Sequence, residues 1–166
     1  MDVFQDKLNN LLKDIYWNIQ KVQEDFVRRV GRSDITMSEM HIIEVVGNAS
    51  LPEDADGLSA DRPVRGCRIS DIAAALDITL PSVTVAIKKL ADKQCVDKIR
   101  CKNDGRQVYV ILTELGQEIY RRHQAFHQRM VKEISLQLTA DEITVMTKVL
   151  ENVNAFFCAK LIQETK

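Results

Sequence analysis

Apolar residues recur at helical spacing near both ends of the chain. From residue 3 to about 30 they lie three or four positions apart, and the same spacing returns from Ile143 to Leu161. This period places them on one face of an α-helix. The run Thr139-Ala140-Asp141-Glu142 has the form of a capping box, which begins a helix. The sequence therefore predicts a long amphipathic helix at each end.

Two further helices are predicted inside these. Ser38 is expected to cap a helix that ends at Gly47, and another helix is expected from Thr113 to about Leu136. The core positions expected for the latter by spacing are Leu115, Ile119, Phe126, Met130 and Ile134. Residues 49–66 contain two prolines, two glycines and four acids, and they are predicted to form a loop that is long for a connection between helices.

Between Ile69 and Leu90 the pattern predicts two short helices separated by a turn. Ser70 is expected to cap the first, which should end near Asp77. Thr79 is expected to cap the second, and a proline is tolerated in its first turn because an N–H there has no helical partner. The buried stripe of this second helix is predicted to be Val83, Ile87 and Leu90. Its outer face should carry Ser82, Thr84, Val85, Lys88 and Lys89.

The spacing changes after this helix pair. Residues 95–101 and 107–112 are rich in β-forming side chains, and the polar run 102–106 between them is typical of a hairpin turn. A helix pair followed by a basic hairpin is a winged helix-turn-helix. The predicted fold is mainly α with a small β-hairpin wing (α+β), a winged helix-turn-helix flanked by long N- and C-terminal helices.

Charge is concentrated on the predicted DNA-binding unit. The whole chain has a formal net charge of −1, which gives no hint of nucleic-acid binding. Between Thr79 and Val108, however, seven basic residues outnumber three acids. The basic residues are Lys88, Lys89, Lys93, Lys98, Arg100, Lys102 and Arg106. Because cations neutralise DNA phosphates, this local excess favours DNA binding over a merely solvated face.

The second helix of such a unit enters the DNA major groove, and an arginine at the wing tip suits a narrow minor groove. We therefore expect DNA contacts from the helix pair and the wing. The predicted residues are Ser70, Thr79, Pro81, Ser82, Thr84, Val85, Lys88, Lys89, Arg100, Lys102, Asp104 and Arg106.

Composition bounds the class of protein. With 166 residues, 45% hydrophobic residues and few aromatics, the chain is long enough for one mainly helical domain with its own core. No N-terminal run is apolar enough for a signal peptide, and no stretch reaches the length of a membrane span. We therefore expect a cytoplasmic protein.

Four segments resemble the MarR (multiple antibiotic resistance regulator) family. They are Ile69-Ser70-Asp71-Ile72-Ala73, Pro81-Ser82-Val83-Thr84, Asn103-Asp104-Gly105-Arg106-Gln107-Val108 and Leu112-Thr113-Glu114-Leu115-Gly116. The resemblance covers nearly the whole chain. It implies a homodimeric bacterial transcription regulator that binds a palindromic operator, in which Arg106 reaches the minor groove and Asp104 holds the wing or that arginine in place.

The resemblance also implies a domain organisation. Residues 1–166 form one domain, with a DNA-binding lobe at 36–113 that contains an inserted acidic loop at 51–66, and dimerisation helices at 1–30 and 114–166. The terminal helices could instead pack on each other within one chain. The loop is interpreted as a tolerated surface insertion, with partner binding or regulation as the alternative. The expected dimerisation residues are Phe4, Leu8, Leu11, Ile15, Leu150, Val153, Phe157 and Leu161.

The histidines suggest a metal site. His123 and His127 lie four residues apart on one predicted helix, a spacing common among zinc ligands. A narrower resemblance, to the zinc-sensing branch of the family, implies that His41 and Glu24 complete a four-ligand site and that zinc acts as co-repressor. The alternative is that the histidines are surface or cavity-lining residues. Where that branch has ligands of a second site, this chain has Val30 and Met40, so that site is absent or rebuilt with Glu39.

Other interpretations remain open. The regulator could respond to a small organic ligand or an oxidant, or the winged helix could bind proteins rather than DNA. Cys67, Cys95, Cys101 and Cys158 show no CxxC spacing and are expected to pack as reduced residues, with a redox switch as the alternative. An enzyme is not expected, because four protein ligands leave no open zinc position and no nucleophile with a paired base is visible.

Overall fold

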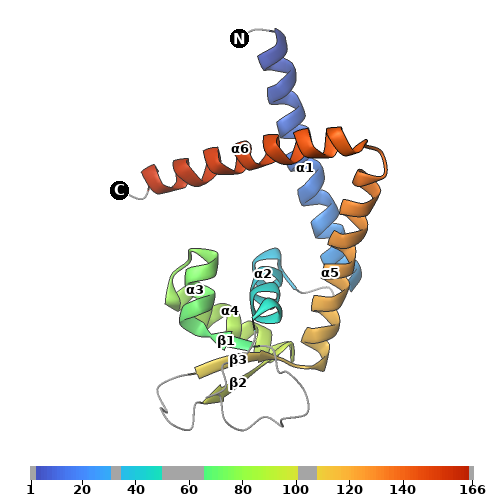
Figure 1. Cartoon of the computed structure of the whole chain (residues 1–166). Helices are drawn as coiled ribbons and strands as arrows, with labels where there is room; N and C mark the ends of the chain where they lie inside the picture. Colours follow the sequence, from blue (N-terminus) through green and yellow to red (C-terminus); the bar gives the residue numbers. More distant parts are fainter. Residues whose placement is uncertain (1–2, 31–34, 50–65, 101–107, 165–166) are drawn as a thin grey trace. The chain divides into compact units, whose positions relative to one another are not determined.

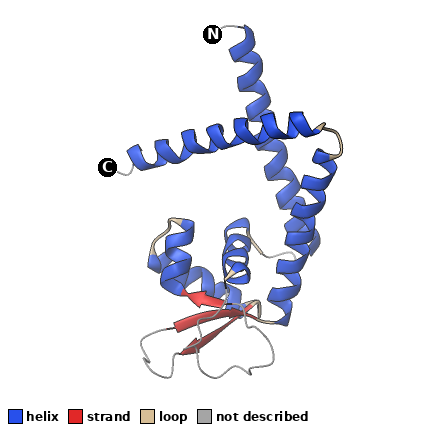
Figure 2. Ribbon diagram, in the orientation of Figure 1, coloured by secondary structure: helices blue, strands red, loops and turns tan. Residues whose placement is uncertain are grey.

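A computed structural model of the chain describes residues 3–30, 35–49, 66–100 and 108–164. Its elements, in order, are α1 (Val3–Val30), α2 (Met37–Asn48), β1 (Gly66–Arg68), α3 (Ile69–Leu76), α4 (Leu80–Asp92), β2 (Val96–Arg100), β3 (Val108–Leu112), α5 (Glu114–Ser135) and α6 (Ala140–Glu164) (Figures 1 and 2). The chain divides into two compact units, residues 1–123 and 124–166, with the boundary inside α5. The predicted fold class is confirmed.

The long terminal helices form as predicted. The capping box of α6 is present, because the backbone N–H of Thr139 donates to Oε2 of Glu142 at 2.8 Å and the N–H of Glu142 donates to Oγ1 of Thr139 at 3.3 Å. The hydrogen bonds from Thr139 lower the pKa of Glu142. Two orphan donors at the helix start are thereby satisfied by side chains.

The start of α2 differs from the prediction. Thr36, not Ser38, is the N-cap: its Oγ1 accepts from the N–H of Glu39 at 3.3 Å, while the Glu39 carboxylate accepts from the N–H of Thr36 at 2.8 Å. Ser38 lies exposed inside the first turn. Thr36 is preferred because it has a glutamate three residues later, which completes a capping box, and Ser38 has none. The helix ends at Asn48, one residue after Gly47.

The start of α3 also differs. The helix begins at Ile69, directly after β1, so Ser70 lies in the first turn and does not cap it. Arg68 occupies the cap position and makes no side-chain capping bond. Since the chain arrives at α3 as a paired strand, the strand fixes where the helix begins. The predicted end is confirmed, with Asp77 in the left-handed conformation at φ 51°.

The wing belongs to a sheet of three strands rather than two. β3 lies between β1 and β2 and pairs with both in antiparallel register, with Cys67 opposite Val110 and Val96 opposite Leu112. Strand β1 was not predicted, because its three residues directly follow the predicted loop and are too few to show a period of two. Residues 50–65 and 101–107, which include most of that loop and the hairpin tip, lie outside the described residues.

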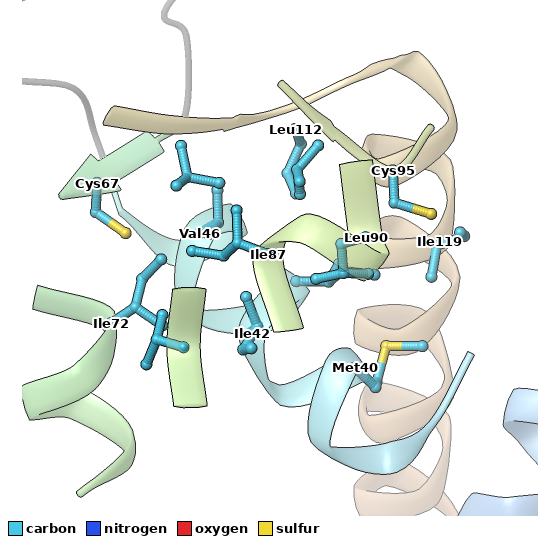
Figure 3. Close-up of a cluster of buried hydrophobic side chains, with 14 of the residues drawn as sticks. Met40, Ile42, Val46, Cys67, Ile72, Ile87, Leu90, Cys95, Leu112 and Ile119 are labelled. Atoms are coloured by element: carbon cyan, nitrogen blue, oxygen red, sulfur yellow. The ribbon is translucent and has the colours of Figure 1, made fainter. Parts of the chain in front are cut away.

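Side chains from the helices and the sheet meet in one core (Figure 3). The predicted stripe of α4, Val83, Ile87 and Leu90, is fully buried. Figure 3 shows Ile87 and Leu90 near Ile42 and Val46 of α2. On α5, Ile119 is buried as expected, while Leu115, Phe126 and Met130 are partly buried and Ile134 is exposed in the single chain, contrary to its predicted burial. This core fixes α4 against α2 and the sheet.

The structure explains why residue 116 is a glycine, which the sequence pattern did not explain. A Cβ at this position would collide with the backbone carbonyl oxygen of Cys95. The turn is held by Thr113, whose hydroxyl donates to the Gln94 carbonyl at 2.7 Å and accepts from the Gly116 N–H at 3.1 Å. Only glycine lets the first turn of α5 approach the chain before β2 this closely.

No single helix among those described is both long enough and apolar enough to cross a membrane. The α3 and α4 helices reach such a length and apolar content only when they are taken together, and they are bent by 112° relative to each other. The core contacts of Ile72, Val83 and Ile87 account for this apolar composition, because all three side chains are fully buried between the helices and the sheet.

Candidate nucleic-acid interface and predicted metal ligands

The turn between α3 and α4 sets the direction of α4. The two helices are related by a bend of 112°, within the range of a helix-turn-helix. Asp77 ends α3 in the left-handed conformation, and Thr79 caps α4 by accepting from the N–H of Ser82 at 3.4 Å. Pro81 lies in the first turn of α4. The predicted cap and turn are confirmed.

One face of α4 is free of the core. All the residues predicted for this outer face are exposed, as are Ser70 and Pro81. Val85 is 56% exposed, whereas Val83 and Ile87 are fully buried. Lys88 and Lys89 are exposed on the same helix. The structure thus places the predicted α4 residues on one open surface, which has the shape and charge expected of a recognition helix.

The hydroxyl groups on this surface are engaged within the helix. Oγ1 of Thr84 donates to the carbonyl oxygen of Leu80 at 2.8 Å. The hydroxyl oxygens of Thr79 and Ser82 lie 2.9 Å apart and share a hydrogen bond. These hydroxyls therefore already make local hydrogen bonds that the sequence pattern did not show.

A groove of about 580 Å³ runs between the start of α2 and the outer face of α4. It is lined by Thr36, Ser38, Glu39, Pro81, Ser82, Val85, Ala86 and Lys89. No DNA-facing role was predicted for the start of α2. Helical spacing shows which face of α2 is buried, but it does not show which residues of another helix lie beside its first turn.

Glu39 joins the start of α2 to the end of α4. Its carboxylate accepts from the ammonium of Lys93 at 2.7 Å and is almost completely buried. Burial alone would raise the pKa of Glu39, but the hydrogen bonds from Lys93 and from the Thr36 backbone outweigh burial and lower it. Lys93 was counted in the basic patch, yet its charge is committed to this ion pair.

The wing is described only in part. Lys98 is exposed on β2, and Arg100 ends that strand. Lys102, Asp104 and Arg106, as well as the side chain of Arg100, lie outside the described residues. The DNA contacts expected from the wing therefore stay predictions.

His123, the central predicted metal ligand, is buried. It is 2% exposed, and its ring lies 5.5 Å from that of Phe26 on α1. His41 and Glu24 are both exposed. Glu24 precedes Phe26 by two residues, a rotation of about 200° around an α-helix. The side of α1 that meets His123 therefore carries Phe26, and Glu24 lies nearly opposite.

His127 lies beyond the unit boundary, one helical turn after His123 on α5. It is partly buried, and its ring lies 5.3 Å from that of Phe126. Among the residues that the structure describes, no three His, Cys, Asp or Glu side chains are grouped so that they could hold a metal ion. The four predicted ligands therefore stay a prediction, and Glu39, suggested for a second site, is already bound to Lys93.

No disulfide joins the described cysteines. Cys67 and Cys95 are buried, and Cys158 is exposed. Burial, with a smaller contribution from Asp71, raises the pKa of the Cys67 thiol to about 11, which disfavours the reactive thiolate at neutral pH. Cys101 lies outside the described residues. A small cavity of about 170 Å³ lies beside Cys95 and is lined by Ile35, Asp92, Lys93, Gln94, Cys95, Leu115 and Ile119.

Comparison with known proteins agrees with this geometry. A sequence model described as the MarR family matches residues 65–108, which span β1, α3, α4, β2 and the start of β3. The crystal structure of Streptococcus pneumoniae FabT in complex with DNA is 30% identical in sequence, with a TM-score of 0.78, over 92% of this chain and 96% of that one. The chain belongs to the MarR family. Both the predicted family and the predicted winged helix-turn-helix are confirmed.

Two curated relatives match different lengths of the chain. The homoprotocatechuate degradative operon repressor of Escherichia coli is 31% identical over 81 residues, which is 49% of this chain and 55% of that protein. The match therefore spans about half the length of that relative. The transcriptional regulator AdcR of Streptococcus pyogenes is 25% identical over 163 residues, covering 91% of this chain and 99% of that protein. These relatives are named as regulators and not as enzymes.

Proposed function

We propose that this MarR-family protein is a sequence-specific DNA-binding transcriptional regulator that acts as a repressor. The observation that carries the proposal is the geometry of the helix pair. The bend of 112° turns α4 so that its core stripe is buried while Val85, Lys88 and Lys89 face outward. A helix held in this way by its neighbours is rigid enough to enter a major groove. The similarity to FabT, whose crystal structure contains DNA, supports the proposal that α4 lies against DNA.

Local charge supports DNA as the partner. The exposed lysines of α4 and Lys98 of β2 lie on the helix-turn-helix and its sheet, whereas the net charge of the chain is −1. Each lysine that neutralises a phosphate releases counterions, so binding falls steeply with salt. The concentration of cations on one element gives the molecule a side that attracts DNA despite its overall charge.

The protein is proposed to act as a homodimer. Both terminal helices expose large apolar side chains that a solitary chain would leave in water. On α1, Phe4 is 71% exposed and Ile15 is 53% exposed; on α6, Leu150 is 55% exposed and Phe157 is 56% exposed. A second copy of the chain is the partner that would cover them. The side chain of Leu161 lies outside the described residues.

A two-fold dimer has consequences for the DNA that it recognises. Two α4 helices would face half-sites about one helical turn apart, so the operator should be palindromic. Because bacterial DNA lies in the cytoplasm, the proposal places the protein there. It assigns the protein no catalytic role.

The DNA-binding surface is tested by removing the α4 lysines. We expect Lys88→Ala and Lys89→Ala each to weaken binding to all duplexes and to reduce the slope of log affinity against log salt by about 1 for each phosphate left without its cation. Lys132→Ala, at an exposed lysine of α5, is the charge-matched control and should change neither quantity. Fluorescence anisotropy with labelled duplexes gives both. An equal weakening in all three variants, or in none, would contradict the assignment of α4.

Zinc is proposed as the effector, with the role of co-repressor. The support is the resemblance to the zinc-sensing branch at Glu24, His41, His123 and His127, whose imidazole and carboxylate donors suit zinc. Among the described residues no three potential ligands form a group, so the proposal concerns metal binding itself. No step of DNA recognition is assigned to the metal.

Metal binding is measured directly, independently of DNA. Metal-stripped protein competes with a chromophoric chelator for zinc, and we expect one tight site per chain that is absent in His41→Ala and His123→Ala. His41 is exposed, so its replacement should leave the fold intact even if the replacement of buried His123 does not. The control is Arg129→Ala, an exposed residue of α5 that carries no zinc donor. The absence of any tight site in the wild type would remove zinc from the proposal.

A small organic effector is the second candidate. The cavity beside Cys95 has a volume of about 170 Å³, which is comparable to cavities that hold a single small ring, and its lining combines apolar side chains with the charged Asp92 and Lys93 and the polar Gln94. Measuring DNA affinity with zinc and with small organic acids distinguishes the two candidate effectors. A protein whose DNA affinity ignores zinc but changes with a small organic acid would favour the cavity.

A further inference from the structure

Val85 occupies the centre of the outward face of α4. It lies two residues after Val83 and two before Ile87, both fully buried, and two residues correspond to a rotation of about 200° around a helix. Val85 therefore points almost directly away from the core, and 56% of it is exposed. It is the apolar side chain best placed to meet whatever lies against the recognition helix.

Nothing in the described structure of the chain accounts for a valine at this point. Alanine is the better helix former, because a β-branched side chain loses rotational freedom in a helix. The buried stripe does not use Val85 either, since the stripe is complete without it. The side chain is therefore suited to a surface outside the chain.

The surroundings of Val85 are apolar at the centre and cationic at the edge. Pro81 is exposed one turn before it, and the two side chains line the same groove beside α2. Thr84 directs its hydroxyl back to the Leu80 carbonyl at 2.8 Å. Lys88 and Lys89 follow Val85 on the exposed surface. The centre of the outer face of α4 is therefore apolar, while the lysines make its edge positively charged.

In the major groove only one base edge of normal DNA presents a methyl group, and that base is thymine. We propose that Val85, with Pro81 beside it, determines specificity by packing against thymine C5 methyl groups. The inference rests on the proposed function, because it names what α4 reads when it lies in the groove. The lysines then supply affinity for any sequence, and Val85 supplies preference for thymine at defined positions.

The expected size of the effect follows from one buried methyl group. Burial of one methyl or methylene is worth about fourfold in affinity, so each half-site should contribute a factor of about four. In a dimer the two half-sites act together, and the combined weakening should be about sixteenfold. Effects of this size are well within the range of anisotropy measurements.

The experiment begins by selecting duplexes from a random library with the full-length protein. Each thymine of the enriched duplex is then replaced by deoxyuridine, which removes only the C5 methyl. We expect one or two thymines per half-site at which this replacement weakens wild-type binding about fourfold. The same replacements should have a clearly smaller effect on Val85→Ala, which keeps Pro81 but loses two methyl groups of the valine. If no thymine is sensitive, or if Val85→Ala keeps the same sensitivity, the inference is overturned.

Two further variants separate the inference from its foundation. Lys88→Ala should bind all duplexes more weakly yet keep the full sensitivity to deoxyuridine, because it retains Val85. Val85→Thr has nearly the same shape as the wild type but replaces one methyl with a hydroxyl, and it should keep only part of that sensitivity. If the wild-type protein enriches no duplex, both the proposed function and the inference fail. If it enriches a duplex that is insensitive to deoxyuridine, the inference alone fails.

Discussion

At the scale of single residues, Glu39 illustrates how one carboxylate can serve two elements. Its carboxylate accepts from the N–H of Thr36, the N-cap of α2, at 2.8 Å, and from the ammonium of Lys93, the C-cap residue of α4, at 2.7 Å. The start of α2 and the end of the recognition helix are thereby tied by one buried group. A buried ion pair of this kind is costly to break, because the remaining charge loses its partner.

We expect Glu39→Gln to lower the free energy of unfolding at pH 7 by about 2 kcal/mol, the usual worth of a hydrogen bond to a charged group. The pKa of Glu39 is lowered by folding, so its contribution is present above the ordinary pKa of a glutamate and is lost as the pH falls through the lowered value. The difference between wild type and variant should therefore be full at pH 7 and shrink below about pH 4. Urea denaturation at several pH values measures it. A difference independent of pH would contradict the ion pair.

Gly116 gives a second prediction at this scale. Replacing a helical glycine with alanine normally stabilises a protein by about 0.5–1 kcal/mol. Here the added Cβ would meet the Cys95 carbonyl oxygen, which belongs to the backbone and cannot move aside. We expect Gly116→Ala to be destabilising by about 1–3 kcal/mol in urea denaturation, as overpacking usually is. As a control, Ala125→Gly at an exposed position of α5 should show the ordinary preference of a helix for alanine.

At the scale of elements, capping residues determine where most of the helices begin and end. The start of α2 is a case in which the sequence offers more than one capping residue. Two residues of capping type, Thr36 and Ser38, precede the apolar run. Only Thr36 is followed by glutamate at the third position, and only Thr36 makes the reciprocal hydrogen bonds. The chain therefore provides its own matched pair of variants for testing the assignment.

We expect Thr36→Ala to lower stability by about 1 kcal/mol, the usual cost of losing an N-cap. Ser38→Ala should change stability by less than about 0.5 kcal/mol, because Ser38 is exposed and inside the helix. Thermal and urea denaturation of both variants provide the comparison. The opposite order would return the cap to Ser38.

Sequence periodicity predicted the long helices, the α4 stripe and strands β2 and β3, since each is long enough to show its period. It missed β1 and misplaced the start of α3, where a strand of three residues leads directly into a helix. It also predicted the exposed face of α4 correctly. It did not predict that the hydroxyls of that face bond within the helix, because rotamers are chosen by local competition that spacing does not record.

Contacts distant in sequence were the least predictable part of the site. The ring of His123 meets Phe26 across 97 positions of the chain, and Glu39 meets Lys93 across 54. Helical spacing indicates which side of each helix is buried, but it does not indicate which residue of another helix lies opposite. The predicted zinc ligands therefore had suitable chemistry, while the structure brings a phenylalanine to the central histidine.

At the scale of the whole molecule, the exposed apolar faces of α1 and α6 are the feature that a single chain leaves unexplained. We expect wild-type protein to sediment at twice the mass of one chain, and Leu8→Glu to shift it toward the mass of one chain by placing a charge in the apolar face. Asn10→Glu is the control, because Asn10 lies two residues on, nearly opposite on α1. Equal dimer content in both variants, measured by analytical ultracentrifugation, would contradict a role for this face.

The central claim is that α4 gives a MarR-family dimer preference for one DNA sequence. The most direct test is the ratio of affinities for the duplex enriched by selection and for a scrambled duplex of the same length and composition, at physiological salt. We expect the enriched duplex to bind at least about 10³-fold more tightly, the lower end for specific DNA-binding proteins. Equal affinity for the two duplexes, or no measurable affinity for either, would contradict the account.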